Sequence, residues 1–381
     1  LFKYYEFILL SASDLAALCG FSINLGGALE YADFFVYLTG LSFFSFQAIA
    51  YLADCYSGKT EKAFSLVETA SYLSFFPTVC AGPIMRPSEF IGQTQALHAD
   101  ETCFSEGICL ILSGLLKKVV IASYLSEHVV NDVFSTPDAC SSLTVIVGIY
   151  GYAAQIFCDF SGYSDLAMGI GRFFGFRLPQ NFDGPYLSLS IRDFWRRWHI
   201  TLSLWLRDYL YIPLGGSRRG NTYVNLLLTM VIGGLWHGSA WTFVIWGTLH
   251  GLGLVLHRLL SRLFKTFSGS LIWKAFSWLL TFHFVAALWV FFRADDLAIA
   301  KSVFKQAAAF STAGIGCSLL AVAAILACFI IQLLGRKAGT CFTCFFMRLP
   351  WLLQGLLAGL LATGIMALGP EGTLPFIYFG F

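Results

Sequence analysis

The sequence predicts an all-α fold, a polytopic bundle of transmembrane helices. Hydrophobic residues make up 57% of the 381 residues, against roughly 45–50% in soluble domains on a definition that counts Gly but not Tyr. Charged residues make up 12%, about half of the usual share of about 25%. So few charges could not keep a chain of this length soluble, and the apolar excess is therefore expected in lipid.

The apolar runs are long and continuous, which predicts membrane helices of about 20 residues rather than the short alternating strands of a barrel. The clearest predicted spans are residues 34–53, 141–158, 223–236, 241–257, 275–292, 315–334 and 351–368. Residues 64–85 are interrupted by two prolines, and residues 107–123 by two lysines. These two segments are predicted to tilt, to re-enter, or to lie in a protein-lined cavity.

Charge and cysteine content argue against two classes of function. The formal net charge is +2, which gives no field that would gather nucleic acid. The 11 cysteines are scattered, mostly inside apolar runs, where Cys behaves as a small hydrophobe. The one close pair, Cys341 and Cys344, lacks a second pair at zinc-like spacing. Structural thiols are therefore favoured over a metal or disulfide role, and no metal site is predicted.

The distribution of basic residues predicts the orientation of the spans. Residues 172–219 carry eight arginines and are placed on the cytoplasmic side. Arg258 follows one hairpin later, as expected if residues 223–257 leave and return. The later spans then put the C-terminal residues 369–381, which contain no basic side chain, outside.

Residues 186–212 are predicted to form a basic, aromatic-rich amphipathic helix rather than a membrane span. Trp195, His199 and Leu202 recur at helical spacing. Helices of this kind lie in the headgroup plane or pack under a bundle. An interfacial anchor explains most of these residues equally well. However, His199 lies on the aromatic stripe rather than on the arginine face, so its side chain is predicted to point toward protein.

Two further histidines, His237 and His250, lie in predicted membrane helices. Ionisable groups in membrane segments are costly and are functional-site candidates by default. Glycines flank His237 closely, which lets another backbone or a substrate approach. The alternative is that each imidazole only hydrogen-bonds a neighbouring helix, and for His250 this alternative is equally strong.

An intramembrane imidazole suits acyl transfer. Its pKa is ordinarily near neutrality, so it can take a proton from an attacking hydroxyl and return it to a leaving group. A thioester donor needs little more than such a base and a geometry that excludes water. An ion-coupled transporter would pair the histidines with intramembrane carboxylates, and residues 223–257 contain none. Acyl transfer is therefore favoured over ion coupling.

Several motifs resemble the membrane-bound O-acyltransferase family, in order from about Phe2 to the C-terminus. They are FP at 76–77, AGPI at 81–84, RP at 86–87, FCDFSGYSD at 157–165, GIGR at 169–172, NF at 181–182, PY at 185–186, FWRRWH at 194–199, RDY at 207–209, PLGGS at 213–217 and WHG at 236–238. The branch that the chain is most similar to acetylates alginate or peptidoglycan in bacteria, with the D-alanyl teichoic-acid exporters as a sister branch.

The resemblance implies a bundle with interfacial and re-entrant helices around a central tunnel. It also implies two catalytic histidines. His237 would be the catalytic base, and His199 would help to position the donor from the cytoplasmic side. Within and beside the matching motifs, the residues expected to bind substrate are Trp236, Trp198, Arg196, Asp159, Ser161, Asn181 and His250.

The resemblance further implies the substrates, the partner and the location. The expected donor is cytoplasmic acetyl-CoA, with no bound cofactor. The arginine-rich stretch would meet CoA phosphates, although positive-inside anchoring explains it equally well. The expected partners are membrane lipids and an extracytoplasmic SGNH-type O-acetyltransferase that modifies a cell-surface glycan, peptidoglycan being favoured over alginate. The expected location is the bacterial cytoplasmic (inner) membrane.

Three alternatives stay open at this point. The donor could be a D-alanyl thioester on a carrier protein, used for teichoic acid. The chain could be a membrane transporter without chemistry, in which case it would not hydrolyse acyl-CoA. It could also be a structural subunit whose histidines only pack.

The last expectations concern the two ends of the chain. The ending FIYFGF at 376–381 resembles the family ending in which a tyrosine is thought to carry the acyl group, so Tyr378 is a third candidate catalytic residue. An interfacial aromatic anchor explains the same residues. At the other end, the family normally has more hydrophobic segments before the match begins. We therefore expect residues 1–381 to be one membrane-embedded domain that lacks N-terminal transmembrane helices of the full-length protein.

Overall fold

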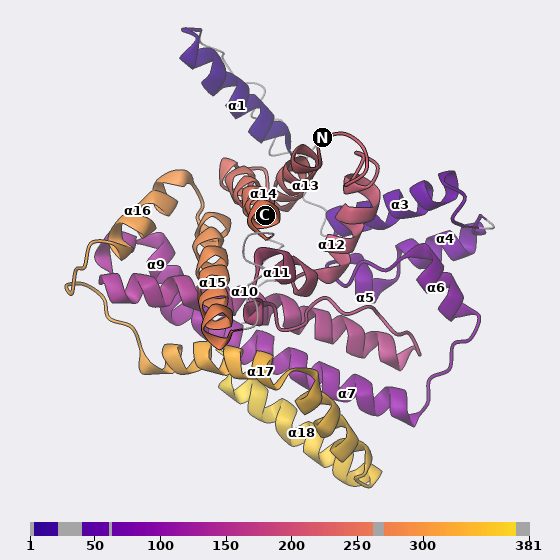
Figure 1. Cartoon of the computed structure of the whole chain (residues 1–381). Coiled ribbons are helices and arrows are strands. Elements are labelled where there is room, and N and C mark those ends of the chain that lie inside the picture. Colours follow the sequence, from indigo (N-terminus) through magenta and orange to yellow (C-terminus); the bar gives the residue numbers. More distant parts are fainter. Residues whose placement is uncertain (1–3, 22–39, 61–62, 262–269, 371–381) are drawn as a thin grey trace.

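The computed structural model describes residues 4–21, 40–60, 63–261 and 270–370 (Figure 1). In the first half of the chain its helices are α1 (Tyr5–Leu18), α3 (Leu41–Tyr56), α4 (Leu66–Leu73), α5 (Phe76–Val79), α6 (Pro87–Thr94), α7 (Glu101–Leu115), η3 (Leu116–Ala122), α8 (Ser123–Leu125), η4 (Ser126–Val130), α9 (Asn131–Ser135), η5 (Pro137–Ala139), α10 (Ser142–Phe173) and η6 (Pro185–Leu187). In the second half they are α11 (Ile191–Arg197), α12 (Ile200–Leu206), η7 (Arg207–Tyr211), α13 (Thr222–His237), α14 (Trp241–Leu260), α15 (Leu271–Arg293), α16 (Leu297–Ala307), α17 (Leu319–Met347) and α18 (Trp351–Leu368).

The all-α prediction is confirmed for these ranges, where the one β contact is an isolated bridge between Cys140 and Ile315. Five helical stretches are long and apolar enough to cross a membrane, and six if the two halves of α17, bent at Gly335, form one span. The chain is therefore a polytopic helical membrane protein. The central tunnel stays a prediction.

Several helices begin where the sequence offers a capping side chain. Asp100 accepts from the Cys103 amide before α7 (2.8 Å), and Ser141 accepts from the Thr144 amide before α10 (3.2 Å). Such side chains satisfy amides that have no partner inside the helix. Helices α14 and α18 begin without a side-chain cap, and their predicted starts and ends, like those of α13, lie within three residues of the observed ones.

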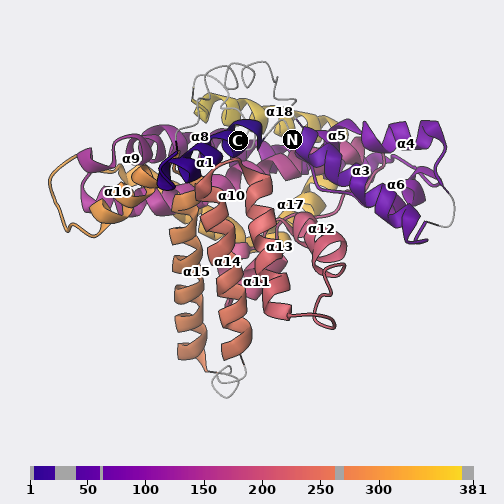
Figure 2. The ribbon, with the colours of Figure 1, turned by 90° about the horizontal axis from the view of Figure 1, so that it is seen from above.

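The helices form two groups that cross. In Figure 1 α7, α10, α17 and α18 run across the view, whereas α13 and α14 are seen nearly end-on. Figure 2 shows α13, α14 and α15 side by side and lengthwise. Glycines allow close packing within the first group, because a Cβ at Gly114 of α7 would lie 2.6 Å from the Gly162 carbonyl oxygen of α10.

Two buried ion pairs join the same two helices. Lys117 in the π-helical turn η3 lies 2.5 Å from Asp165 of α10, and Lys118 pairs with Asp159. Ser113 adds a hydrogen bond to Asp165 (2.8 Å). The prediction for 141–158 was therefore too short: α10 continues to Phe173 because its carboxylates are neutralised by lysines that lie about 40 residues earlier in the sequence.

Two other predicted helices differ from the structure. Residues 64–85 form the short helices α4 and α5 rather than one span, and Pro77 lies in the first turn of α5, where its missing N–H costs nothing. Residues 186–212 were expected to form one amphipathic helix, which is wrong. The helix breaks between Trp198 and His199 into α11 and α12, and His199 itself has φ +41°.

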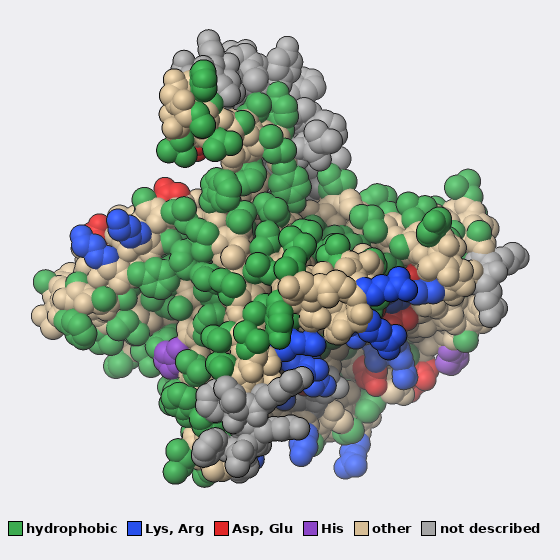
Figure 3. All heavy atoms as spheres, turned by 45° about the horizontal axis from the view of Figure 1, so that its top comes forward, with side chains coloured by type: hydrophobic (Ala, Val, Ile, Leu, Met, Phe, Trp, Pro, Cys, Tyr) green, Lys and Arg blue, Asp and Glu red, His purple; other side chains and the backbone are tan. Residues whose placement is uncertain are grey.

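The surface agrees with a protein embedded in lipid. Figure 3 shows hydrophobic side chains over much of the face drawn, with most Lys and Arg side chains toward its lower right and a smaller group at the left. Leu256 and Leu360, for example, are 54% and 63% exposed. Exposed apolar residues at this density indicate a surface that contacts acyl chains rather than water.

Candidate functional site

Three histidines from different elements are buried in the core of the bundle. His237 ends α13, His250 lies in the middle of α14, and His199 lies between α11 and α12. Their exposed fractions are 4%, 0% and 0%. The prediction that His199 points into protein is confirmed, although by a break in the helix rather than by its position on a continuous stripe.

Tryptophan rings connect the three imidazoles in one series. The Trp236 ring centroid lies 6.4 Å from that of His199 and 4.8 Å from that of His237. The Trp246 ring centroid lies 5.2 Å from that of His237 and 4.7 Å from that of His250. The order in space is thus His199, Trp236, His237, Trp246, His250.

Close packing of α13 on α14 produces this series. A Cβ at Gly234 would lie 2.4 Å from the Phe243 carbonyl oxygen, and one at Gly238 would lie 2.1 Å from the Phe243 ring. The glycines next to His237 were predicted to admit a backbone or a substrate. What approaches them here is α14 itself, so the side chains of both helices share one narrow region.

Asn181 holds the unusual backbone of His199. Its carbonyl oxygen accepts from the Ile200 amide (3.0 Å), and its side-chain oxygen accepts from the Thr201 hydroxyl (2.6 Å). Its side-chain nitrogen donates to Ser164 of α10 (3.3 Å). A residue with a β-carbon at positive φ persists only where its surroundings fix it, and these bonds do so.

The surroundings of His199 are aromatic and dry. The Phe160 ring centroid lies 4.6 Å away in an edge-on arrangement, and the Phe43 ring centroid lies 6.3 Å away. Both ring nitrogens of His199 lack a hydrogen-bond partner among the residues that the structure describes. Buried polar atoms in folded proteins nearly always have one. Both nitrogens are therefore candidates to bind a reacting group, and burial favours the neutral, basic imidazole.

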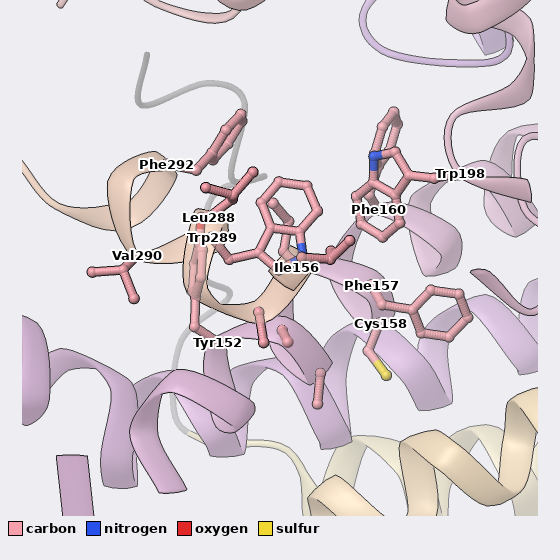
Figure 4. Close-up of a cluster of buried hydrophobic side chains, with 14 of the residues drawn as sticks. Tyr152, Ile156, Phe157, Cys158, Phe160, Trp198, Leu288, Trp289, Val290 and Phe292 are labelled. Carbon is pink, nitrogen blue, oxygen red and sulfur yellow. The ribbon is translucent and has the colours of Figure 1, made fainter. Parts of the chain in front are cut away.

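The other predicted substrate-binding residues lie in several places. Trp236 is half-buried against Phe46 (ring centroids 4.7 Å apart), and Trp198 packs on Trp289 (4.9 Å). Figure 4 shows the Trp198 and Trp289 side chains in one cluster with residues of α10. Ser161 is buried in α10.

Three predicted residues lie apart from the histidines or outside the described ranges. Asp159 belongs to the ion pair with Lys118, and Arg196 is exposed on α11. Tyr378 lies outside the residues that the structure describes. Their roles as substrate-binding or catalytic residues stay predictions, as does that of Asn181, whose contacts fit a positioning role better. Within the described ranges, no group of three or more His, Cys, Asp or Glu side chains could hold a metal ion.

Sequence reasoning missed Trp246, Trp195 and Trp289, which contact the histidines. Trp246 and His250 are four residues apart and therefore share one face of α14, a signal that was available. Trp195 and Trp289 come from α11 and α15, and only the packing of those helices brings them to His250.

Matching motifs that lie far apart in the sequence meet at the C-terminal end of α3. Arg86 pairs with Asp208 (2.6 Å), and the Tyr209 hydroxyl donates to Asp54 (2.8 Å). The Arg86 guanidinium lies 4.6 Å from the Tyr209 ring centroid. Burial and the bond to Asp54 raise the pKa of Tyr209 to about 12. This cluster fastens α12 and η7, and with them His199, to α3.

Comparison with known proteins agrees with these motifs. The sequence model of the membrane-bound O-acyltransferase family matches residues 29–293, which include all three buried histidines. That range covers more than half of the chain.

Curated relatives come from three groups. "Probable alginate O-acetylase AlgI" of Pseudomonas putida is 42% identical over 267 residues, which are 70% of this chain and 54% of that protein. "Peptidoglycan O-acetyltransferase" of Helicobacter pylori is 39% identical over 330 residues, 74% of this chain and 62% of that protein. "Teichoic acid D-alanyltransferase" of Streptococcus thermophilus is 29% identical over 242 residues, 60% of this chain and 58% of that protein. The chain thus spans about half the length of the first of these relatives.

Proposed function

The chain belongs to the membrane-bound O-acyltransferase family, and we propose that it is an O-acetyltransferase working across the bacterial inner membrane. It takes acetyl groups from cytoplasmic acetyl-CoA and passes them to an extracytoplasmic SGNH-type partner enzyme, which acetylates a cell-surface glycan. The observation that carries the proposal is that two buried histidines, His199 and His237, both lie next to the Trp236 ring, with their centroids 6.4 and 4.8 Å from its centroid.

His237 acts as the general base. It takes the proton of the acceptor hydroxyl while that oxygen attacks the thioester carbonyl. The C–S bond then breaks, and the thiolate leaves with the proton that His237 held, so that thiol and ester are the products. His199 orients the donor carbonyl. The aromatic walls around both rings keep water from competing for the thioester.

The first acceptor in this proposal is the hydroxyl of Tyr378, which then carries the acetyl group to the partner enzyme. An acyl ester on a tyrosine is an ordinary covalent intermediate of group transfer. The alternative role for Tyr378 is an aromatic anchor at the membrane surface. The two assignments differ in whether the protein itself retains label from the donor.

We favour peptidoglycan as the final glycan, with alginate second. Relatives named for each are about equally similar, at 39% and 42% identity, but the peptidoglycan O-acetyltransferase matches over more residues, 330 against 267. D-alanyl transfer from a carrier protein is the second donor chemistry, and the relative named for it is less similar, at 29% identity.

Trapping of label on the protein tests the proposal. Full-length protein in nanodiscs is incubated with radiolabelled acetyl-CoA, as wild type, His237→Ala and Tyr378→Phe. The matched control is His283→Ala, since His283 is an exposed histidine of α15 whose Nδ1 lies 2.7 Å from the Leu279 carbonyl oxygen. We expect label on the wild type and the control and on neither test variant.

The other outcomes separate the alternatives. Label lost only in His237→Ala would keep the enzyme and reduce Tyr378 to an anchor. If the wild type neither retains label nor cleaves acetyl-CoA, the donor assignment is wrong, and a carrier-protein thioester is tested next. Failure with both donors would favour a transporter.

A further inference from the structure

His250 is the centre of a second group of buried polar atoms. Its two ring nitrogens have no hydrogen-bond partner in the described part of the chain. The same holds for the indole nitrogens of Trp195 of α11 and Trp246 of α14. Trp289 of α15 also contacts His250, but its indole interacts with the Tyr186 hydroxyl. The three indole rings lie 5.1, 4.7 and 6.5 Å from the His250 ring, between centroids.

The chemistry of these atoms restricts what they can bind. An indole N–H only donates, and a neutral imidazole supplies one donor and one acceptor. The group therefore offers up to three donors against one acceptor. Its occupant must be rich in acceptor oxygens and poor in donors. Carbonyl groups meet this requirement, whereas a sugar hydroxyl brings a donor with each acceptor.

The position of the group along α14 favours the donor side of the reaction. From His237 the ring contacts run to Trp246 and then to His250, one turn further from the α13–α14 connection. Eight residues beyond His250, about 12 Å along a helix, lies the exposed Arg258. On α11 the exposed Arg192 precedes Trp195 by three residues. An acyl thioester that enters at this basic end passes His250 before it reaches His237.

We propose that His250 with Trp195 and Trp246 binds the carbonyl groups of the thioester donor and its amide-bearing arm, and that Trp289 forms an aromatic wall of this subsite. This inference rests on the proposed function, because it assigns a subsite to its donor. The indole and imidazole donors hold the carbonyl oxygens, and the aromatic faces pack on the intervening methylene groups. The group binds the donor and takes no proton in the reaction, so its residues are specificity determinants and not catalytic residues.

Removal of single indole donors tests the subsite. Trp195→Phe and Trp246→Phe keep an aromatic ring and lose the N–H. The control is Trp278→Phe of α15, whose indole N–H already donates to the Tyr186 carbonyl oxygen (2.8 Å). The probe is a ketone analogue of acetyl-CoA in which a methylene replaces the sulfur, so that the carbonyl is kept and nothing is cleaved. Its dissociation constant is measured on full-length protein in nanodiscs.

We expect each test variant to bind the analogue about two- to tenfold more weakly, the effect of one lost hydrogen bond, and the control to bind like the wild type. In turnover, the KM for acetyl-CoA should rise while the KM for the acetyl acceptor stays unchanged.

Equal binding by all variants, with wild-type binding intact, would assign the unpartnered atoms to water and overturn the subsite alone. If the wild type binds no analogue and cleaves no acetyl-CoA, the proposed function fails instead. A His250→Gln variant retains one donor and one acceptor, so it should bind the analogue more tightly than His250→Phe. This comparison distinguishes the loss of hydrogen bonds from misfolding.

Discussion

Two interfaces in this molecule differ in whether their buried polar side chains have partners. Between α10 and the α7–η3 stretch, each lysine has its carboxylate, Lys117 with Asp165 and Lys118 with Asp159. Where α14 meets α11, the nitrogens of His250 and of the Trp195 and Trp246 indoles have no partner within the ranges that the structure describes. Both interfaces lie among helices suited to a membrane.

This difference distinguishes an interface that stabilises the fold from a candidate binding site. A paired charge in a low-dielectric interior is tolerated because its partner offsets the desolvation. An unpaired donor is costly unless something from outside the fold binds it. We therefore interpret the paired interface as structural, and we propose the unpaired one as a substrate site. Four predictions probe this contrast.

The largest effect is expected at His237. His237→Gln removes the base and should lower kcat for acetyl-CoA cleavage by about 10²- to 10⁴-fold, the usual contribution of general base catalysis. The unfolding temperature in detergent should stay near that of wild type. A His283→Gln control should keep its activity. If His237→Gln retained most of its activity while its unfolding temperature fell, the residue would be a packing residue.

Substitutions in the paired interface should change the free energy of unfolding rather than the catalytic rate. Asp165→Leu leaves Lys117 buried without its carboxylate and should lower the free energy of unfolding by about 3–5 kcal/mol. Lys117→Met combined with Asp165→Leu should recover most of that loss, because no uncompensated charge remains. Denaturant titration in mixed micelles measures both. A double variant as unstable as Asp165→Leu would assign these residues a role beyond pairing.

Asn181 connects the two kinds of region, because it joins α10 to the backbone at His199. Asn181→Asp keeps the oxygen that accepts from Thr201 but loses the donor to Ser164. We expect a loss of about 1–3 kcal/mol in stability and a fall in kcat with little change in the KM for donor. Asn181→Leu should lower kcat further. A rise in KM alone would instead make Asn181 a substrate-binding residue.

The smallest effect is expected at Tyr209, which lies at the periphery. Tyr209→Phe loses the hydrogen bond to Asp54 and should cost about 0.5–1.5 kcal/mol. The pKa of Tyr209 is raised to about 12, so its hydroxyl stays protonated in both states at neutral pH. The cost should be equal at pH 6 and pH 9 and shrink only above pH 10, as the unfolded tyrosine ionises. Urea titration at several pH values checks this.

The sequence was sufficient for the apolar helices. Continuous hydrophobic runs are a local property, which is why α14 was expected at 241–257 and is observed at Trp241–Leu260. The sequence was insufficient where a residue far away in the chain determines the local structure. The extent of α10 depends on Lys117 and Lys118, and the break at His199 depends on Asn181, none of which periodicity can reveal.

The candidate site, like the fold, could be predicted from the sequence only in part. His237 became a candidate because an imidazole in an apolar segment is an anomaly that the sequence shows directly, and His199 because it lies on the aromatic stripe of a basic amphipathic stretch. Trp195 and Trp289 look like ordinary core aromatics in sequence. Their relevance comes from packing against His250 and, for Trp195, from an indole nitrogen that lacks a partner in the described ranges.

The central claim is that His199 and His237 work as one unit around Trp236. A double-mutant cycle on the initial rate of acetyl-CoA cleavage tests it most directly, with His199→Gln, His237→Gln and the double variant in identical nanodiscs. Groups that act as a unit are strongly non-additive. We predict that the double variant is no slower than the slower single variant. Additive losses would contradict the account and show two histidines acting independently.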